Sequence, residues 1–454
     1  MRRLSAVQIG AFLALMLFSI SWSPWGWNWT DLQRWCFLIS TSISLMTLLS
    51  EGGDAFSVPA RLRWQVCVLV SGALTSVLLS DVPFWSLLEF GVWMSLWLNA
   101  FAVRTSLSQG AMRSRWLLVC LVLAVAVFVV VRFGVFLLAL SENPLVAMDA
   151  LYGGFSNVRS LGHFQTLTIP VLAGGFFLFG GAKRFFCLAL LIAWCWVAVY
   201  THTRGTFLAA LVVICACLFT RGRIGKRLAA LIATAFCLAW IANALMLAVP
   251  DSALALAAEA SNLRHPAGAA SLAGREVLWG QAWTLFERNP WFGTGPMGFA
   301  NLHSPLGAHP HNIVLQLLAE WGGVPTFCLA VLAGVFGHRL WRLVRQCSLE
   351  IHEVVAIMSL LGLLAQSLVD GVFVLPFSQF CLALSAGWVW FVLARHDTSA
   401  QTGESAVLRK LICFGVTACV VYVFLFSLAD FSFSYPDRAF QSVQWPRYWA
   451  VGFI

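Results

Sequence analysis

Long runs of apolar residues, separated by short polar breaks, dominate the pattern along this chain. Each run holds about 17 to 25 residues, enough α-helix to cross a hydrocarbon core of about 30 Å. Lipid offers the backbone no hydrogen-bond partners, so such runs fold as helices. We predict thirteen spans, approximately Val7–Trp22, Gln33–Leu49, Trp64–Ser80, Phe84–Phe101, Trp116–Leu140, His163–Gly180, Phe185–Tyr200, Thr206–Thr220, Leu228–Val249, Val324–Gly337, Val354–Phe373, Phe377–Leu393 and Leu411–Leu428.

The polar breaks divide the chain into four parts. We expect an N-terminal bundle of about nine transmembrane helices at 1–249, a long outer loop at 250–323, further transmembrane helices at 324–428 and an outer tail at 429–454. The first run follows Arg2 and Arg3 as a signal peptide would, but no small-residue cleavage pattern follows it. The tryptophans of Ser23–Thr30 indicate an interfacial aromatic belt instead. The predicted fold is all-α, with about 12–13 transmembrane helices.

The long outer loop contains an amphipathic pattern from Gly274 to Arg288. Its apolar residues recur at helical spacing, Trp279 and Trp283 fall on one face, and the pattern stops at Asn289–Pro290. We predict a helix that lies on the membrane surface. The preceding part, Asp251–Leu272, is helical or mobile. The GxGxxG pattern at Gly293–Gly298 follows no strand, so we interpret it as a tight turn and not as a nucleotide site.

Composition supports a membrane location and excludes a nucleic-acid partner. The chain is 60% hydrophobic and 10% charged, which is incompatible with a solvated surface. Its net charge of +9 comes from small clusters at the helix ends, as the positive-inside rule expects. With the amino terminus in the cytoplasm, the inner clusters are Arg61, Arg63, Arg104, Arg113, Arg115, Lys183, Arg184, Arg221, Arg223, Lys226, Arg227, Arg339, Arg342, Arg345, Arg395, Arg409 and Lys410.

Arginines on the other side go against this bias and are therefore candidates for function. They are Arg159, Arg204, Arg264, Arg275, Arg288, Arg438 and Arg447. A guanidinium is a planar, permanently charged fork that matches phosphate oxygens, so Arg204 and Arg275 together would clamp a diphosphate. The alternative for Arg204 is a helix cap or a side chain that reaches the lipid headgroups.

His309 and His311 stand before an apolar helical stretch in the same outer loop. A histidine accepts a proton near neutral pH, so either could deprotonate an attacking hydroxyl. We favour His311, which directly precedes Asn312. No DxD pair, CxxC motif or Cys/His cluster indicates a metal site, and we expect no cofactor.

Several of these segments together resemble the O-antigen ligase superfamily. They are Thr203-Arg204-Gly205, Arg275 with the helix that stops at Asn289–Pro290, Trp291–Gly295, and His311-Asn-Ile-Val-Leu-Gln-Leu-Leu-Ala-Glu320-Trp-Gly. The resemblance is specific from about Arg204 to Pro325. Upstream it is looser, in Phe155–Arg159 and His163–Gln165.

The resemblance implies a metal-independent, inverting transfer of a glycan from undecaprenyl diphosphate in lipopolysaccharide biosynthesis or protein glycosylation. It assigns the diphosphate to Arg204 and Arg275 and activation of the acceptor to His311. His309, Asn312, Arg159, Arg288, Gln316 and Glu320 are supporting candidates. The expected location is a bacterial inner membrane, with the site facing the periplasm and membrane lipid around the helices.

The acceptor stays open at this point. Lipid A-core is the leading acceptor, and a pilin or other protein and a growing O-antigen are alternatives. The tail, with Tyr435-Pro-Asp-Arg438 and Trp445-Pro-Arg-Tyr-Trp449, either contacts a sugar or acceptor or lies at the membrane interface. A glycolipid transporter or flippase would need paired ionisable residues within the spans, which are nearly free of them; Arg132 and Asp370 are the notable exceptions and are too few to outline an ion path.

Overall fold

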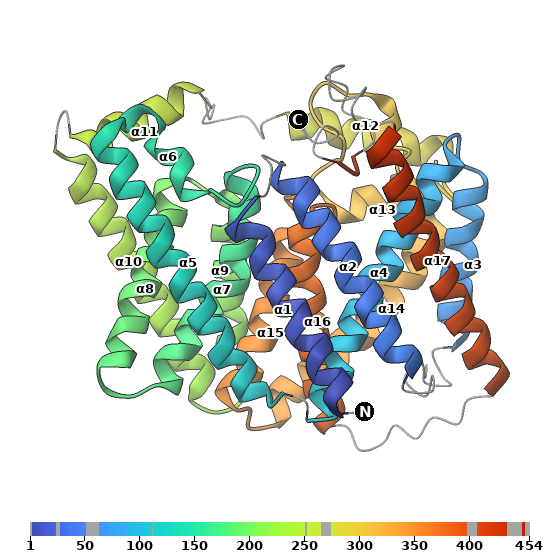
Figure 1. Cartoon of the computed structure of the whole chain (residues 1–454), viewed down its shortest axis with the longest axis horizontal. Coiled ribbons are helices and arrows are strands. Elements are labelled where there is room, and N and C mark those ends of the chain that lie inside the picture. The colour runs from blue at the N-terminus through green and yellow to red at the C-terminus, as the bar shows by residue number, and fades with distance from the viewer. Residues whose placement is uncertain are drawn as a thin grey trace.

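The computed structural model describes residues 2–23, 28–50, 63–110, 112–249, 252–264, 274–396, 406–433 and 447–449. Within these ranges the chain forms seventeen α-helices and no β-strand, which confirms the predicted all-α membrane fold (Figure 1). Several predicted features lie outside the described residues. They are part of the aromatic belt at 24–27, Arg61, residues 265–272 of the outer loop, Tyr435–Arg438 and Trp445.

Each of the thirteen predicted spans coincides with a helix. Ten helices are long and apolar enough to cross a membrane. They are α1 (Arg2–Ser21), α2 (Trp29–Ser50), α4 (Pro83–Ser108), α5 (Ser114–Glu142), α7 (Val158–Leu178), α8 (Gly181–Tyr200), α10 (Ile224–Leu247), α14 (Gly323–Gln346), α16 (Pro376–His396) and α17 (Ala406–Phe433). The other three are shorter apolar helices, α3 (Arg63–Leu78), α9 (Arg204–Leu218) and α15 (Ile351–Gln366).

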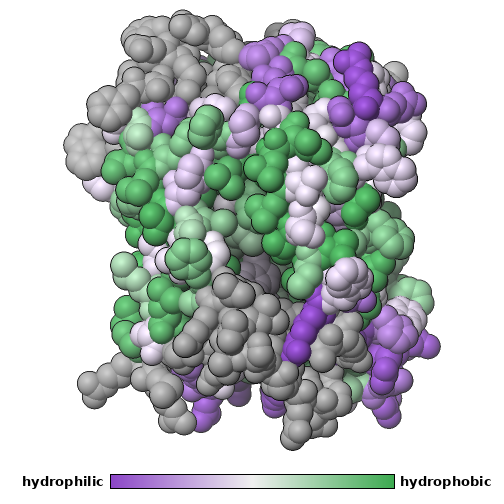
Figure 2. Space-filling view, turned by 90° about the vertical axis from the view of Figure 1, so that its right-hand side faces the viewer, coloured by the Kyte–Doolittle hydropathy of each residue, from purple (hydrophilic) through white to green (hydrophobic). Residues whose placement is uncertain are grey.

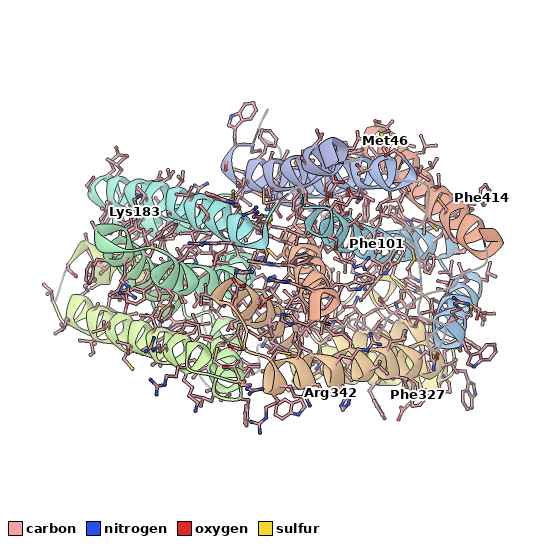
Figure 3. All side chains as sticks on the ribbon, turned by 90° about the horizontal axis from the view of Figure 1, so that it is seen from below. Met46, Phe101, Lys183, Phe327, Arg342 and Phe414 are labelled. Carbon is pink, nitrogen blue, oxygen red and sulfur yellow. The ribbon has the colours of Figure 1, made fainter. Side chains whose placement is uncertain are left out.

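The face of the bundle drawn in Figure 2 is apolar at mid-height. Figure 2 shows a broad hydrophobic band across one face, with hydrophilic residues gathered at its two ends. Met46, Phe327 and Phe414 lie at the rim of the bundle, where their exposed side chains point outward (Figure 3). Large apolar side chains are stable on the surface only where lipid replaces water. The chain is therefore a multi-pass membrane protein.

The remaining four helices are short and gather at the upper end in Figure 1, which we call the site end. They are α6 (Pro144–Leu151), α11 (Ala253–Arg264), α12 (Arg275–Arg288) and α13 (Ile313–Trp321). The predicted amphipathic helix is α12, and α11 shows that part of the preceding segment is helical. We did not predict α6, although Asn143 caps it and Pro144 occupies its first position, both typical of a helix start.

Helices α7, α9 and α15 pack closely where they reach the site end. Thr206 of α9 donates a hydrogen bond to the carbonyl of Gly162 on α7 (3.2 Å). Gln366 of α15 accepts one from Thr166 of α7 (2.6 Å), and a Cβ on Gly205 would lie only 2.9 Å from the Gln366 amide nitrogen. These contacts fix the start of α9, and thereby Arg204, against its two neighbours.

The predicted span Val354–Phe373 is wrong at its C-terminal end. Helix α15 ends at Gln366, and the chain turns through Asp370 before α16 begins at Pro376. The carboxylate of Asp370 accepts a hydrogen bond from the Gly371 N–H (2.9 Å), which stabilises a turn in place of a further helical turn. Asp370 therefore lies in a connection at the site end and not inside a span.

Candidate active site

Four of the predicted site residues come together from four separate elements at the site end. Arg159 lies in the first turn of α7, Arg204 begins α9, Arg275 begins α12, and His311 stands just before α13. The charges of Arg159 and Arg204 both lower the pKa of Arg275, after the larger effect of burial. The charges of Arg159 and Arg275 likewise lower the pKa of His311, again after the larger effect of burial. The four side chains therefore belong to one electrostatically coupled cluster. We call these four residues, together with Asp370 and His163, the site group.

Helix starts place three of these residues. The Asn157 side chain caps α7 by accepting a hydrogen bond from the Ser160 N–H (2.9 Å). Arg159 and His163 are four residues apart on this helix and so share a face. Unpaired N–H groups give a helix N-terminus a partial positive charge. The starts of α7 and α9 therefore add to the positive potential of the arginines.

The three arginines have no negative partner of their own in the part of the chain that the structure describes. Among the described residues, no carboxylate lies at ion-pair distance from Arg159, Arg204 or Arg275. The Nε of Arg275 is buried, and no group in the described part of the chain accepts a hydrogen bond from it. Burial is the largest influence on the pKa of Arg275 and lowers it, whereas the charge of Asp370 raises it. Such a cluster of unpaired cations favours an anionic ligand.

A carboxylate of the site group lies between two histidines. Asp370 has one oxygen 3.5 Å from Nδ1 of His311 and the other 3.2 Å from Nε2 of His163. The opposite ring nitrogen of His163 is hydrogen-bonded to the Ser378 hydroxyl (2.5 Å). Burial alone would raise the pKa of Asp370, but the two histidines outweigh it and hold that pKa well below its ordinary value. Asp370 is therefore ionised at neutral pH.

The backbone of His311 is in the left-handed region, with φ of 52°. A histidine in this conformation is strained and needs support from its surroundings. Asn312 provides it: its side-chain oxygen accepts hydrogen bonds from the Val314 and Leu315 N–H groups (2.9 and 3.1 Å), and its amide donates to the Leu368 carbonyl (3.0 Å). The Ile313 N–H also donates to the Ser367 carbonyl (3.0 Å). The segments that carry His311 and Asp370 are thus tied together.

His309 packs directly against His311. Its ring is buried, lies 4.1 Å from the His311 ring between centroids, and accepts a hydrogen bond from the His311 N–H at Nδ1 (3.2 Å). A Cβ on Gly371 would lie 2.5 Å from this ring, so His309 also packs against the segment of Asp370. Burial, with the His311 and Arg447 charges, lowers the pKa of His309 well below its ordinary value.

The other supporting candidates lie elsewhere. Arg288 is exposed at the far end of α12, about 20 Å along the helix from Arg275. Asn312 positions His311, as described above. Glu320 is buried within a separate ion pair with Arg447, and Gln316 donates a long hydrogen bond to it (3.4 Å). Neither Gln316 nor Glu320 is therefore directed at His311.

The glycine pattern at Gly293–Gly298 is a turn, as predicted. Gly293 and Gly295 have φ of 68° and 86°, a conformation that only glycine adopts without strain. The turn packs on α13: the Thr294 and Gly295 N–H groups donate to the Ala319 and Glu320 carbonyls (3.0 and 2.8 Å). The turn therefore holds the C-terminal end of α13, whereas His311 precedes its N-terminal end.

Both roles predicted for the tail, contact with a sugar or acceptor and a place at the membrane interface, are wrong for the three tail residues that the structure describes. Arg447, Tyr448 and Trp449 are at most 1% exposed, so they neither lie at the membrane interface nor present a surface to a sugar. Sequence reasoning also missed the roles of Asp370 and His163. The signal for Asp370 was available, because an ionisable residue in an apparent span indicates function.

Comparison with known families supports the resemblance seen in the sequence. Residues 186–331, about a third of the chain, match the family model described as O-antigen ligase. This stretch contains Arg204, Arg275, His309 and His311, while Arg159, His163 and Asp370 lie outside it. A comparison with curated proteins gave no match.

Proposed function

Because this chain is similar to the O-antigen ligase superfamily through residues 186–331, we propose that it transfers a glycan from undecaprenyl diphosphate to an acceptor hydroxyl. The reaction takes place at the periplasmic face of a bacterial inner membrane, with lipid A-core as the leading acceptor. One observation carries the proposal: three arginines without carboxylate partners among the described residues form one electrostatically coupled cluster with a histidine that is backed by an ionised aspartate.

Arg204 and Arg275 hold the diphosphate of the donor, and Arg159 adds a third positive charge. Bidentate hydrogen bonds from guanidinium groups fit phosphate oxygens, and the unpaired Nε of Arg275 is available for one of them. As the glycosidic bond breaks, negative charge grows on the leaving diphosphate. Fixed cations stabilise this charge in the transition state, so the proposed mechanism needs no divalent metal.

His311 acts as the general base. Its Nδ1 faces Asp370, which leaves Nε2 to accept the proton of the acceptor hydroxyl. The acceptor oxygen forms a bond to the anomeric carbon, the bond from that carbon to the diphosphate oxygen breaks, and the electron pair leaves with the lipid diphosphate. Attack from the face opposite the leaving group inverts the anomeric centre.

Asp370 and His163 position this base. The carboxylate orients the His311 ring and stabilises the imidazolium that forms when the proton arrives. His163 contacts the other oxygen of Asp370 and is itself bonded to Ser378 of α16, so the carboxylate is held from two sides.

The acceptor is decided by deleting the gene in its host and comparing lipopolysaccharide ladders with the mass of the pilin. We expect loss of the ladder on an intact core, with recovery by the wild-type gene and not by His311→Ala. A core with a single repeat would indicate an O-antigen polymerase, and an unchanged ladder with lighter pilin a protein O-oligosaccharyltransferase. A normal ladder and normal pilin would contradict the proposed function. Purified enzyme should keep its activity in EDTA.

A further inference from the structure

We propose that Arg447, Tyr448 and Trp449, which we call the tail latch, hold His311 at contact distance from Asp370. The latch acts on residues 303–312, which we call the histidine loop, and on the connection that follows Asp370. Its residues are positioning residues because none of them reaches the reacting atoms. A measurement of transfer activity rests on the proposed function, whereas a measurement of hydrogen exchange in the histidine loop does not.

Arg447 is the centre of the latch. It is fully buried and binds both oxygens of Glu320, from Nη1 at 2.5 Å and from Nη2 at 2.7 Å. Nη2 also contacts Glu89 of α4 (3.3 Å), and Nη1 donates to the Ala308 carbonyl in the histidine loop (3.5 Å). One side chain of the tail thus joins α4, α13 and the histidine loop.

Glu320 links Arg447 to the parts of the chain that precede and follow the histidine loop. It lies near the end of α13, the helix that His311 precedes, and it accepts a hydrogen bond from the Phe299 N–H (3.2 Å). Phe299 directly precedes the 3-10 turn Ala300–Leu302, which leads into the histidine loop. The Arg447–Glu320 pair therefore anchors the chain on both sides of His311.

Tyr448 and Trp449 hold Arg447 in place. The Tyr448 hydroxyl is hydrogen-bonded to Ser427 (2.7 Å), and the Trp449 indole donates to Asp430 (2.8 Å), both on α17. The two rings pack with Met297, Ala300 and Ala308 in one buried apolar cluster. The histidine loop therefore rests directly on the latch.

The latch also contacts the segment of Asp370, through Arg34 of α2. The Arg34 guanidinium lies 4.6 Å from the centre of the Tyr448 ring and donates to the Tyr448 carbonyl (3.3 Å). It also donates to the Val374 carbonyl (3.3 Å) and to Gln379 (2.7 Å). Val374 in turn donates to the Gly371 carbonyl (3.0 Å). Both partners of the His311–Asp370 contact are thus supported from the same three residues.

This arrangement matters because the His311–Asp370 contact joins two loops. At 3.5 Å it is already at the limit of a hydrogen bond, so a small relative movement of the loops would separate the two groups. Catalysis is sensitive to displacements of about 1 Å in such groups. We therefore expect loosening of the latch to reduce turnover more than donor binding, which depends on the arginines.

The test compares full-length wild-type protein with Arg447→Ala and Arg447→Lys, in lipid nanodiscs. Arg342→Ala is the matched control, because Arg342 is an exposed arginine of α14 outside the site (Figure 3). Hydrogen exchange is measured by mass spectrometry on the histidine loop, α7 and α9. We expect exchange of the histidine loop to become at least about tenfold faster in Arg447→Ala, with α7 and α9 unchanged and Arg447→Lys intermediate.

Transfer is measured with an undecaprenyl-diphosphate-linked glycan and the acceptor that the gene deletion identifies. We expect kcat to fall about tenfold or more in Arg447→Ala while KM for the donor stays within about twofold of wild type. If Arg447→Ala does not fold, the Tyr448→Phe variant tests the latch instead, because it removes only the hydroxyl that binds Ser427. For Tyr448→Phe we expect a two- to fivefold loss of kcat and faster exchange in the histidine loop.

The latch proposal is overturned if exchange in the histidine loop matches wild type, or if all helices exchange faster together, which would indicate a general role in stability. It is also overturned if an active wild type and Arg447→Ala have the same kcat. Absence of transfer by the wild type would instead contradict the proposed function, and the exchange measurement would still decide on the latch.

Discussion

Two groups of arginines at the site end differ in what neutralises them. Arg159, Arg204 and Arg275 have no carboxylate at ion-pair distance among the described residues, whereas the fully buried Arg447 is paired with Glu320 and Glu89. All four go against the positive-inside bias, so the sequence alone does not separate them. The structure does: an arginine whose charge is already compensated holds the fold together, and one without a partner is free for a ligand.

The largest expected effect is the loss of the base in the site group. His311→Asn should reduce transfer by about 10²- to 10⁴-fold, because it removes the proton acceptor while asparagine tolerates the left-handed backbone. The thermal midpoint of the purified protein should stay close to that of wild type. His309→Ala should keep partial activity, since that ring packs against the base without replacing it. Full activity of His311→Ala would contradict the general-base role.

The unpaired arginines should come next, and they provide the sharpest contrast with Arg447. Arg204→Ala and Arg275→Ala should each reduce kcat/KM by about 10²- to 10³-fold through loss of charge stabilisation. Their thermal midpoints should stay equal to wild type or rise, because each change relieves repulsion between like charges. Glu320→Gln should lower the midpoint, because it removes a charge that compensates the buried Arg447. Equal destabilisation in Arg275→Ala and Glu320→Gln would remove the distinction between the two groups.

A smaller effect, with a characteristic pH dependence, is expected at Asp370. Its charge and its contact with His311 raise the pKa of that histidine against the lowering effect of burial. Asp370→Asn should therefore lower the pKa of His311, so that the base stays unprotonated to lower pH and the acidic limb of the kcat/KM profile moves to lower pH. Activity at the optimum should fall about tenfold or more, because the ring loses its orienting partner. An unshifted acidic limb would exclude Asp370 as the partner of the base.

Arg288 should show the smallest effect. It opposes the topological bias like the others, but the structure places it at the exposed far end of α12, away from the site group. Arg288→Ala should change transfer by less than about twofold and leave the thermal midpoint unchanged. A loss comparable with that of Arg275→Ala would mean that the bound glycan extends along α12.

The spans could be predicted because apolar length is a local property of the sequence. Each predicted run became a helix, and the clear error, the end of α15, arose where a single carboxylate redirects the chain at Asp370. Helix α6 was missed because its eight residues are too few to stand out from the long apolar run before it. The left-handed turn at Gly293 and Gly295 could be inferred, since glycine marks such conformations in any fold.

That the candidate arginines and His311 gather at one end of the molecule could be predicted, because topology brings outer loops to one face. Their partners could not. Asp370 meets His311 only through the packing of α15 against α7 and α9, and Glu320 meets Arg447 across 127 residues of sequence. Gln316 and Glu320 are supporting candidates by the family resemblance, yet Glu320 pairs with Arg447 of the tail and Gln316 contacts Glu320. Whether a buried charge is paired depends on tertiary contacts that no local pattern specifies.

Within the site group, Arg159 and Arg204 stand in the first turns of α7 and α9, two apolar helices of the bundle, and no separate soluble domain is present among the described residues. Under the proposed function, a lipid-linked donor and lipid A-core would therefore meet this protein by lateral diffusion in a plane. The quantity that governs the rate is the mole fraction of each lipid in the membrane and not its concentration in the bulk solution. Dilution with empty bilayer or detergent at constant bulk concentration should slow the reaction, as surface-dilution kinetics requires.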